Sequence, residues 1–283
     1  MFACHVAKAS IRNEVLSCPV SSLSARSIRG VNKIGLFTLI RKEIGRFLNV
    51  YMQTLLAPVI TTILFFMVFA LALGHENEAV DGVPYLEFLA PGLVMMAMVQ
   101  NAFANTSSSI LISKVQGNIV DVLMPPLSPL ELLVGYTVGG VVRGLLVGGL
   151  CLAALSFFVP LAVHSWPVFL AASVLSTLML SLIGVAGGLW SEKFDHMATI
   201  TNFIVTPLAF LSGTFYSIHR LPEIWRDIAV FNPFFHMIDS FRYGMIGHID
   251  AGLATGLGSL IIANILLSIL CYRMLYTGYK IRA

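Results

Sequence analysis

The amino-acid sequence predicts an all-α polytopic membrane protein, and two observations carry this prediction. Hydrophobic residues make up 57% of the 283 residues and charged residues only 11%, whereas a soluble domain carries about 25% charged residues. The apolar residues also gather in stretches of the ~20 residues that a helix needs to cross a bilayer. Six transmembrane helices are therefore expected, at roughly 50–73, 86–111, 131–159, 167–190, 198–217 and 252–275.

Basic residues are concentrated in alternate connections. Lys and Arg precede the first expected transmembrane helix, follow the second and the fourth, and close the chain. The first connection, HENEAVDGVPYLE, holds no Lys or Arg, and neither does the third. Because cytoplasmic connections carry an excess of positive charge, this alternation predicts that both termini lie in the cytoplasm.

The N-terminal segment is expected to remain outside the membrane core. Residues 1–29 lack the apolar region of a secretory signal and predict a disordered tail. Residues 30–48 predict a basic amphipathic helix on the inner membrane surface. Its apolar face would hold Ile34, Phe37, Ile40, Ile44 and Phe47. Its polar face would hold Lys33, Arg41, Lys42, Glu43 and Arg46. Such a helix is either an anchor only or also a docking surface for a cytoplasmic partner.

The connection after the second transmembrane helix, SKVQGNIVDVLMPPLSPLEL, contains a short helical pattern. Val115, Ile119, Val122 and Leu123 make one apolar face, and the prolines that begin at Pro125 end the helix. A passive turn and a partner-docking helix fit this pattern equally well.

The second transmembrane helix carries a polar face. Asn101, Asn105 and Ser109 recur every four residues, and Gln100 lies beside them. Polar groups are costly in lipid, so this face should point into the helix bundle or an aqueous path. Hydrogen bonding between helices and contact with a substrate are both open interpretations.

The third transmembrane helix combines small residues with one buried charge. Gly140, Gly144 and Gly148 form a row that lets helices pack closely. Arg143 lies near the middle of the same helix, where an unpaired arginine costs several kcal/mol. Asn101, Gln100, free carbonyls or a water-filled cavity are its expected partners, and we expect a functional rather than a purely structural role.

Catalytic and nucleotide-binding motifs are absent from the sequence. It holds no GxxxxGK[ST] loop, no HExxH and no GxSxG. The N-terminal ~49 residues form the longest segment outside the membrane, below the usual size of a domain. We therefore expect no enzyme activity, no catalytic residue, no metal site and no nucleic-acid partner.

The stretch from Leu211 to Gly247 is too polar to cross a bilayer and too apolar for an ordinary loop. Pro222 suits the first turn of one helix, and Asn232 and Pro233 supply the N-cap and first position of a second. Each helix is shorter than the ~30 Å core. A re-entrant helical hairpin at about 220–246 is therefore predicted. Two ion pairs would lower the cost of its charges: Glu223 with Arg226, and Asp239 with Arg242.

Two segments resemble a known family. They are MPPLSPLELLVGYTVGGVVRG and PLAFLSGTFYSIHRLPEIWRDIAVFNPFFHMIDSFRYGMIG. They resemble the ABC-2 type permeases, the membrane subunits of one class of ATP-binding-cassette exporters, and in particular a bacterial inner-membrane branch. The resemblance runs from about Ile34 to the C-terminus and makes residues 49–283 an ABC-2 transmembrane domain.

The resemblance implies a permease subunit in the bacterial inner (plasma) membrane, for ATP-driven export of an amphipathic, lipid-like, glycan or drug-like substrate. It implies a second permease subunit, expected as a homodimer, and two P-loop ATPase subunits. ATP and Mg would bind the ATPase partner, and this chain would carry no cofactor. Residues 31–47 look like the interface helix of the family and residues 115–124 like its coupling helix, which favours docking for both segments.

Three sets of site residues follow from the residues and the resemblance together. The transport path is expected at Arg143, Asn101, Asn105 and Gln100. Coupling to the ATPase is expected at Arg41, Lys42, Glu43, Val115, Gly117, Asn118, Ile119 and Asp121. An outer gate is expected at Asn232, Pro233, Arg242 and Tyr243.

Two other function classes fit the sequence less well. An ATP-independent secondary transporter or channel usually shows internal repeats or paired broken helices, and no clear repeat relates the first three transmembrane helices to the last three. An intramembrane enzyme is disfavoured by the missing motifs.

Overall fold

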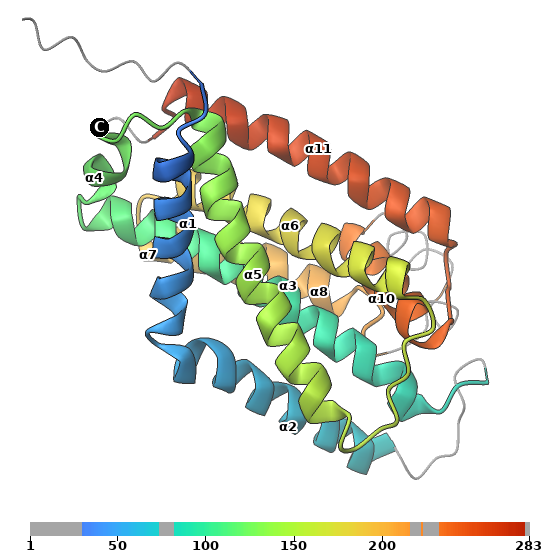
Figure 1. Cartoon of the computed structure of the whole chain (residues 1–283). Coiled ribbons are helices and arrows are strands. Elements are labelled where there is room, and N and C mark those ends of the chain that lie inside the picture. Colours follow the sequence, from blue (N-terminus) through green and yellow to red (C-terminus); the bar gives the residue numbers. More distant parts are fainter. Residues whose placement is uncertain (1–29, 74–81, 216–221, 223–231, 281–283) are drawn as a thin grey trace, which may run out of the picture. The chain divides into compact units, whose positions relative to one another are not determined.

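The structure, a computed structural model, describes residues 30–73, 82–215, 222 and 232–280 (Figure 1). Its elements are all helices. In chain order they are α1 (Lys33–Leu48), η1 (Met52–Leu56), α2 (Ala57–Leu73), α3 (Tyr85–Val115), α4 (Ile119–Leu123), α5 (Pro129–Leu155), α6 (Trp166–Trp190), α7 (Phe194–Ile200), η2 (Thr201–Val205), α8 (Thr206–Phe210), α10 (Pro233–Ile246) and α11 (Leu253–Thr277). The elements η1 and η2 are π-helical turns.

Five of the described helical runs are long and apolar enough to cross a membrane: Met52–Ala72, Tyr85–Val115, Pro129–Leu155, Trp166–Trp190 and Leu253–Thr277. This confirms the all-α polytopic class. The run expected at 198–217 differs, because the helix formed by α7, η2 and α8 ends at Phe210. Gly213 has φ +72°, a backbone conformation that suits glycine and turns the chain out of the helix. This run is about 25 Å long at 1.5 Å per residue.

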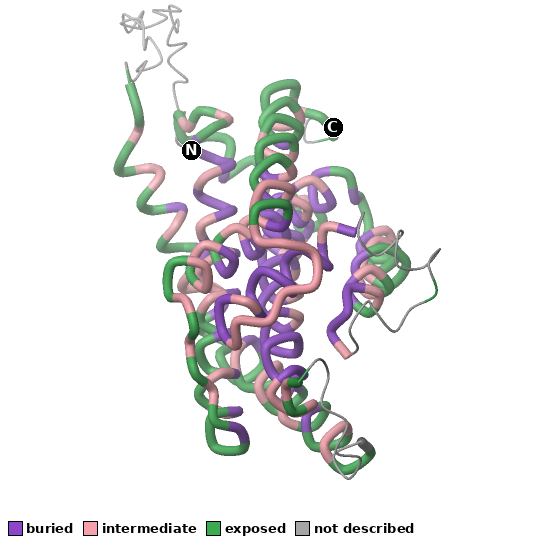
Figure 2. The backbone as a smooth tube through the Cα atoms, turned by 90° about the vertical axis from the view of Figure 1, so that its right-hand side faces the viewer, coloured by how far each residue is buried: buried purple, intermediate pink, exposed green. Residues whose placement is uncertain are grey.

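Helices α3, α5 and α6 make the core of the bundle, and buried residues gather along them in Figure 2. The expected glycine row lies at these contacts. A Cβ on Gly140 would lie 2.4 Å from Ser181 Oγ of α6, and one on Gly148 would lie 2.4 Å from Met98 of α3. The close approach of these helices therefore depends on residues without side chains.

Helix α1 packs on α5 through a row that includes residues from both predicted faces. Its buried residues are Leu39, Glu43 and Phe47. Ile34 and Phe37, predicted on the apolar face that would meet the membrane surface, are 82% and 65% exposed. Glu43, predicted on the polar face, lies instead in the row that contacts the bundle.

One end of the bundle collects α4, the start of α1 and the ends of α3, α6 and α11 (Figure 1). Lys114, at the end of α3, donates from Nζ to the carbonyl oxygens of Leu189 and Ser191, at 2.7 and 2.6 Å. Lys280 pairs with Glu192 at 2.9 Å, and its hydrogen bond lowers the pKa of that carboxyl. These contacts hold the helix ends together at this side.

Helix α10 begins as the sequence predicted. Asn232 accepts a hydrogen bond from Phe234 N at 3.0 Å, and Pro233 occupies the first helical position. The preceding helix of the expected hairpin and the Glu223–Arg226 pair lie outside the described residues, as does the tail at 1–29.

The expected ion pair between Asp239 and Arg242 is not formed. Asp239 accepts hydrogen bonds from the backbone N–H groups of Asp250 and Ala251, at 2.8 and 3.1 Å. Arg242 donates to Gly213 O at 2.8 Å. Both side chains are buried, and each finds its partner on another segment rather than one turn away on α10.

Candidate functional site

Two cavities lie on either side of the polar face of α3. The large cavity, of about 440 Å³, lies between α3 and the run formed by α7, η2 and α8. The small cavity, of about 300 Å³, lies between α3 and the run formed by η1 and α2. Gln100 and Asn101 line both. The amides predicted for the transport path therefore stand between two cavities, and each opposite wall contains a π-helical turn.

The large cavity has two chemically different kinds of wall. Amides and hydroxyls come from Gln100, Asn101, Ser107, Ser108, Thr201 and Thr206, and apolar side chains from Phe103, Leu111, Phe194, Met197 and Val205. None of the described residues that line either cavity carries a charge. Such a cavity suits a molecule with an uncharged polar part and an apolar part.

Arg143 reaches Asn101 from α5. Its Nη2 donates to Asn101 Oδ1 at 2.9 Å, and Asn101 Nδ2 donates to Ala97 O at 2.9 Å. One of the partners expected for Arg143 is thus present. Because both polar atoms of Asn101 are engaged, while Gln100 makes no hydrogen bond within the described parts of the chain, Gln100 is the amide free to contact a ligand.

Asn105 belongs to a different cluster. Arg46 Nη2 donates to the backbone and side-chain oxygens of Asn105, at 2.7 and 3.0 Å. Glu43 accepts a hydrogen bond from Ser109 at 2.7 Å and lies 3.4 Å from Arg46. Asn105 is therefore held by α1 and does not line the cavities. Glu43, expected on an exposed docking face, is fully buried.

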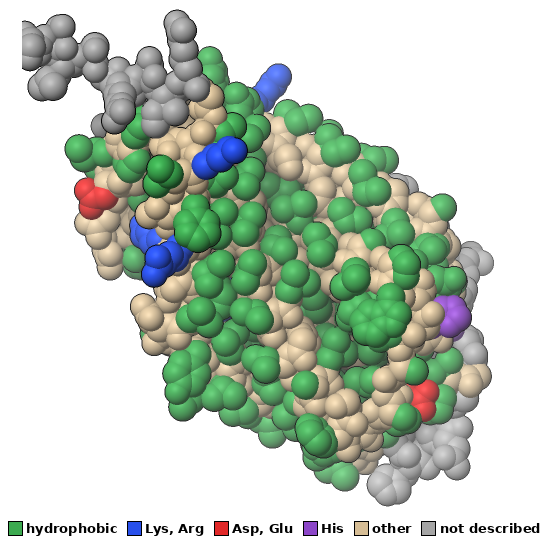
Figure 3. Space-filling view, viewed as in Figure 1, with side chains coloured by type: hydrophobic (Ala, Val, Ile, Leu, Met, Phe, Trp, Pro, Cys, Tyr) green, Lys and Arg blue, Asp and Glu red, His purple; other side chains and the backbone are tan. Residues whose placement is uncertain are grey.

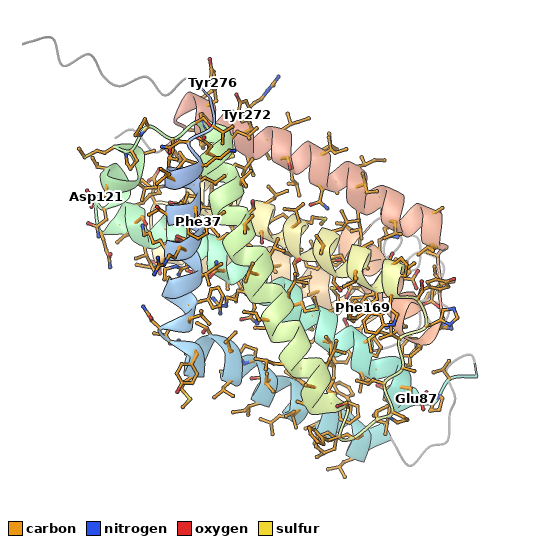
Figure 4. All side chains as sticks on the ribbon, viewed as in Figure 1. Phe37, Glu87, Asp121, Phe169, Tyr272 and Tyr276 are labelled. Atoms are coloured by element: carbon orange, nitrogen blue, oxygen red, sulfur yellow. The ribbon has the colours of Figure 1, made fainter. Side chains whose placement is uncertain are left out.

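A groove of about 270 Å³ separates α1 from α4, with Lys42 on one side and Asp121 on the other. The other residues expected for coupling, apart from Glu43, do not line it: Arg41, Val115, Gly117 and Asn118 are exposed, and Ile119 is half-buried. Gly117 has φ +75° and makes the turn that begins α4 possible. Phe37 and Asp121 mark this end of the molecule in Figure 4.

Helix α1 and the segment around α4, which border the groove, also carry exposed apolar side chains: Ile34, Phe37, Val120, Leu123 and Met124. In Figure 3, charged side chains lie at the two ends of the visible face, with a broad hydrophobic band between them. The groove lies at one of these charged ends, where a hydrophilic partner can reach it.

One residue outside the predicted site sets, Glu131, holds the start of α1. Glu131 accepts hydrogen bonds from the backbone N–H groups of Asn32 and Ser128, and so joins the start of α1 to the start of α5. Ser128 and Glu131 form a capping box. The signal was present as SPLE, the serine-x-x-glutamate pattern that begins a helix.

Two of the four residues expected for an outer gate hold α8 and the turn that follows it. Asn232 Nδ2 donates to Leu208 O at 2.9 Å. The Arg242 guanidinium binds Gly213 O and lies 3.7 Å from the centre of the Phe88 ring. Asn232 and Arg242 thus both hold the segment that follows η2, while Pro233 begins α10. The fourth, Tyr243, packs edge-on against His164.

Comparison with known proteins matches residues 35–246 to the ABC-2 type transporter family. The inner membrane transport permease YadH of Escherichia coli (strain K12) is 38% identical over 250 residues, which cover 88% of this chain and 98% of that protein. Nodulation protein J of Rhizobium leguminosarum bv. viciae is 27% identical over 196 residues, or 67% of this chain and 74% of that protein. The likeness extends over most of the chain.

Proposed function

Because the chain belongs to the ABC-2 type transporter family, as a multi-pass permease of the inner membrane, we propose that it forms the path for ATP-driven export of an amphipathic cargo. The pair of cavities that meet at Gln100 and Asn101 carries this proposal. An uncharged polar head would contact Gln100, and an apolar part would contact Phe103 and Phe194. Lipid-like, glycan and drug-like molecules with such a division all fit.

The family implies an ATPase partner, and we place it at the groove between α1 and α4. The oppositely charged Lys42 and Asp121 and the exposed apolar residues around them support this placement. Two ATPase subunits would bind ATP and Mg, since this chain has no P-loop. A second copy of this chain would complete the path as a homodimer.

The orientation follows from charge. Basic residues lie at the end that holds α4: Arg41, Lys42, Lys114, Lys193 and Lys280. The positive-inside rule puts this end, and both termini, in the cytoplasm. The run α7–η2–α8 would then be a short sixth crossing, and α10 the returning half of a re-entrant hairpin on the outer side.

At that outer side we assign the gate to Asn232 and Arg242, because both hold the end of the run that walls the large cavity. Arg242→Lys keeps the charge but cannot bind Gly213 O and stack on Phe88 in the same way. Export should fall while the amount of folded chain in the membrane stays close to normal. Unchanged export would remove the gate assignment.

A copurification experiment tests the proposal as a whole. The chain, extracted from membranes, should bring a P-loop ATPase with it, and the ATPase activity should respond to candidate cargo. Asp121→Lys should weaken this association, whereas Asp195→Lys, a matched change at an exposed carboxylate away from the groove, should not. A chain that transports without any ATPase would instead support an ATP-independent transporter or channel.

A further inference from the structure

An ionic cluster with a fully buried carboxylate joins α1 to α3. The Glu43 side chain is fully buried, accepts a hydrogen bond from Ser109 at 2.7 Å and lies 3.4 Å from Nη2 of Arg46, whose side chain is 30% exposed. Burying a carboxylate costs desolvation energy that only well-placed partners offset. A helix that served only as a surface anchor would not need such a cluster. The cluster therefore indicates that α1 holds a fixed position against α3.

Arg46 reaches the wall of the large cavity directly. Its Nη2 holds both oxygens of Asn105, and its Nη1 donates to Ser108 Oγ at 3.3 Å. Ser108 lines the large cavity. One guanidinium therefore connects the helix that borders the docking groove to the face of α3 that borders the cargo cavity.

Two further contacts keep α1 in this position. On the α5 side, Gly139 leaves room for Glu43, since a Cβ there would lie 2.7 Å from Glu43 Cβ. At the end of α1, Thr54 of η1 donates to Phe47 O at 2.7 Å, and the adjacent Gln53 lines the small cavity. A shift of α1 would thus reach both cavities.

We infer that Glu43 and Arg46 are positioning residues that transmit a displacement of α1 to the α3 wall of the large cavity. This rests on the proposed function, because α1 is displaced only if an ATPase docks at the groove. The guanidinium binds its three acceptors together and releases them together, which gives the two discrete arrangements that coupling between distant sites requires. Glu43 sets the position of the guanidinium.

Cysteine labelling in the complex with its ATPase tests the inference without knowledge of the cargo. Thr201→Cys places a thiol on the large cavity. Cys4 and Cys18 are replaced by serine, the buried Cys151 and Cys271 are kept, and labelling of the chain without an added thiol is subtracted. The rate of maleimide labelling should change at least about threefold when a non-hydrolysable ATP analogue binds.

Arg46→Met should abolish this nucleotide response while the ATPase still copurifies, and Arg46→Lys should keep part of it. Arg273→Met is the matched control, since it removes an exposed arginine from α11 and should leave the response unchanged. A full response in Arg46→Met overturns the inference, and so does loss of the ATPase from that variant, because Arg46 would then support docking.

If Arg46→Met fails to accumulate, the double variant Arg46→Lys with Ser108→Ala decides. It keeps the positive charge and removes the acceptor on the cavity wall, so a full nucleotide response in it would overturn the inference. Failure of the proposed function is a separate result: no ATPase would copurify even with the unsubstituted chain.

Discussion

A methyl group added at Gly184 would test the packing of α6 against α3. The new Cβ would lie 2.1 Å from Thr106 Oγ1 and 2.7 Å from the backbone oxygen of Phe103. The hydroxyl can rotate away, but the carbonyl belongs to the backbone of α3. Since ordinary contacts begin near 3.4 Å, the two helices would have to separate by roughly 0.7 Å.

The change in the free energy of unfolding caused by Gly184→Ala is the difference between two effects. Overpacking a close contact costs about 1–3 kcal/mol, and the better helix propensity of alanine returns up to about 1 kcal/mol. Gly149→Ala is the matched control, because nothing lies within 4 Å of a Cβ at that position. Gly149→Ala should therefore show only the gain in helix propensity.

The assay is the fraction of folded chain left after heating in detergent, measured by size-exclusion chromatography. The midpoint for Gly184→Ala should fall by about 2–4 °C for each kcal/mol lost, and that for Gly149→Ala should stay or rise. Equal midpoints for the two variants would show that the close approach of α3 and α6 does not depend on Gly184.

Three further predictions follow from single contacts. Lys114→Met removes a charged donor from the carbonyls of Leu189 and Ser191. It should lower the free energy of unfolding by about 1–3 kcal/mol and so lower the midpoint of the heating assay. An unchanged midpoint would mean that water forms equally good hydrogen bonds with these carbonyls. Asn232→Ala removes the N-cap of α10 and should lower the free energy of unfolding by about 0.5–2 kcal/mol, which also lowers the midpoint. An unchanged midpoint would show that the cap does not stabilise the chain. Gln100→Glu puts a carboxylate between uncharged cavities and should move binding from neutral to cationic amphiphiles, measured with photoactivatable probes of equal chain length. A preference of the unsubstituted chain for the anionic probe would contradict the assignment.

Residue rows within one helix could be predicted from the sequence. The spacing of 3.6 residues per turn puts Asn101, Asn105 and Ser109 on one face of α3 and Gly140, Gly144 and Gly148 on one face of α5. It could not show which helix each residue meets. Asn101 and Asn105 lie one turn apart, yet one binds Arg143 of α5 and the other binds Arg46 of α1.

The buried face of α1 could not be predicted from hydropathy. In a membrane protein the outer surface is apolar as well, so an apolar row does not mark the core. Ile34 and Phe37 are exposed, while Glu43 is buried because Ser109 and Arg46 satisfy its carboxylate. Arg46 is three residues from Glu43, but Ser109 is 66 residues away in the chain and leaves no local pattern.

The length of the run that ends at Phe210 was overestimated for a related reason. Hydropathy counts apolar residues on both sides of Gly213, but the left-handed conformation of that residue ends regular helix geometry there. Arg242 then binds the carbonyl of Gly213, so the turn is held from α10. A residue 29 positions later in the chain therefore holds the turn that follows the helix.

The two π-helical turns give the cavity walls a way to rotate in place. A π turn holds one residue more than an α turn, and one residue corresponds to about 100° around a helix axis. If η1 or η2 returned to α geometry, the residues beyond it would swing around the axis without a large tilt of the helix. Gln53 in η1 and Thr201 in η2 would then turn toward or away from the cavities that they line. The two cavities could then change in chemistry as well as in width.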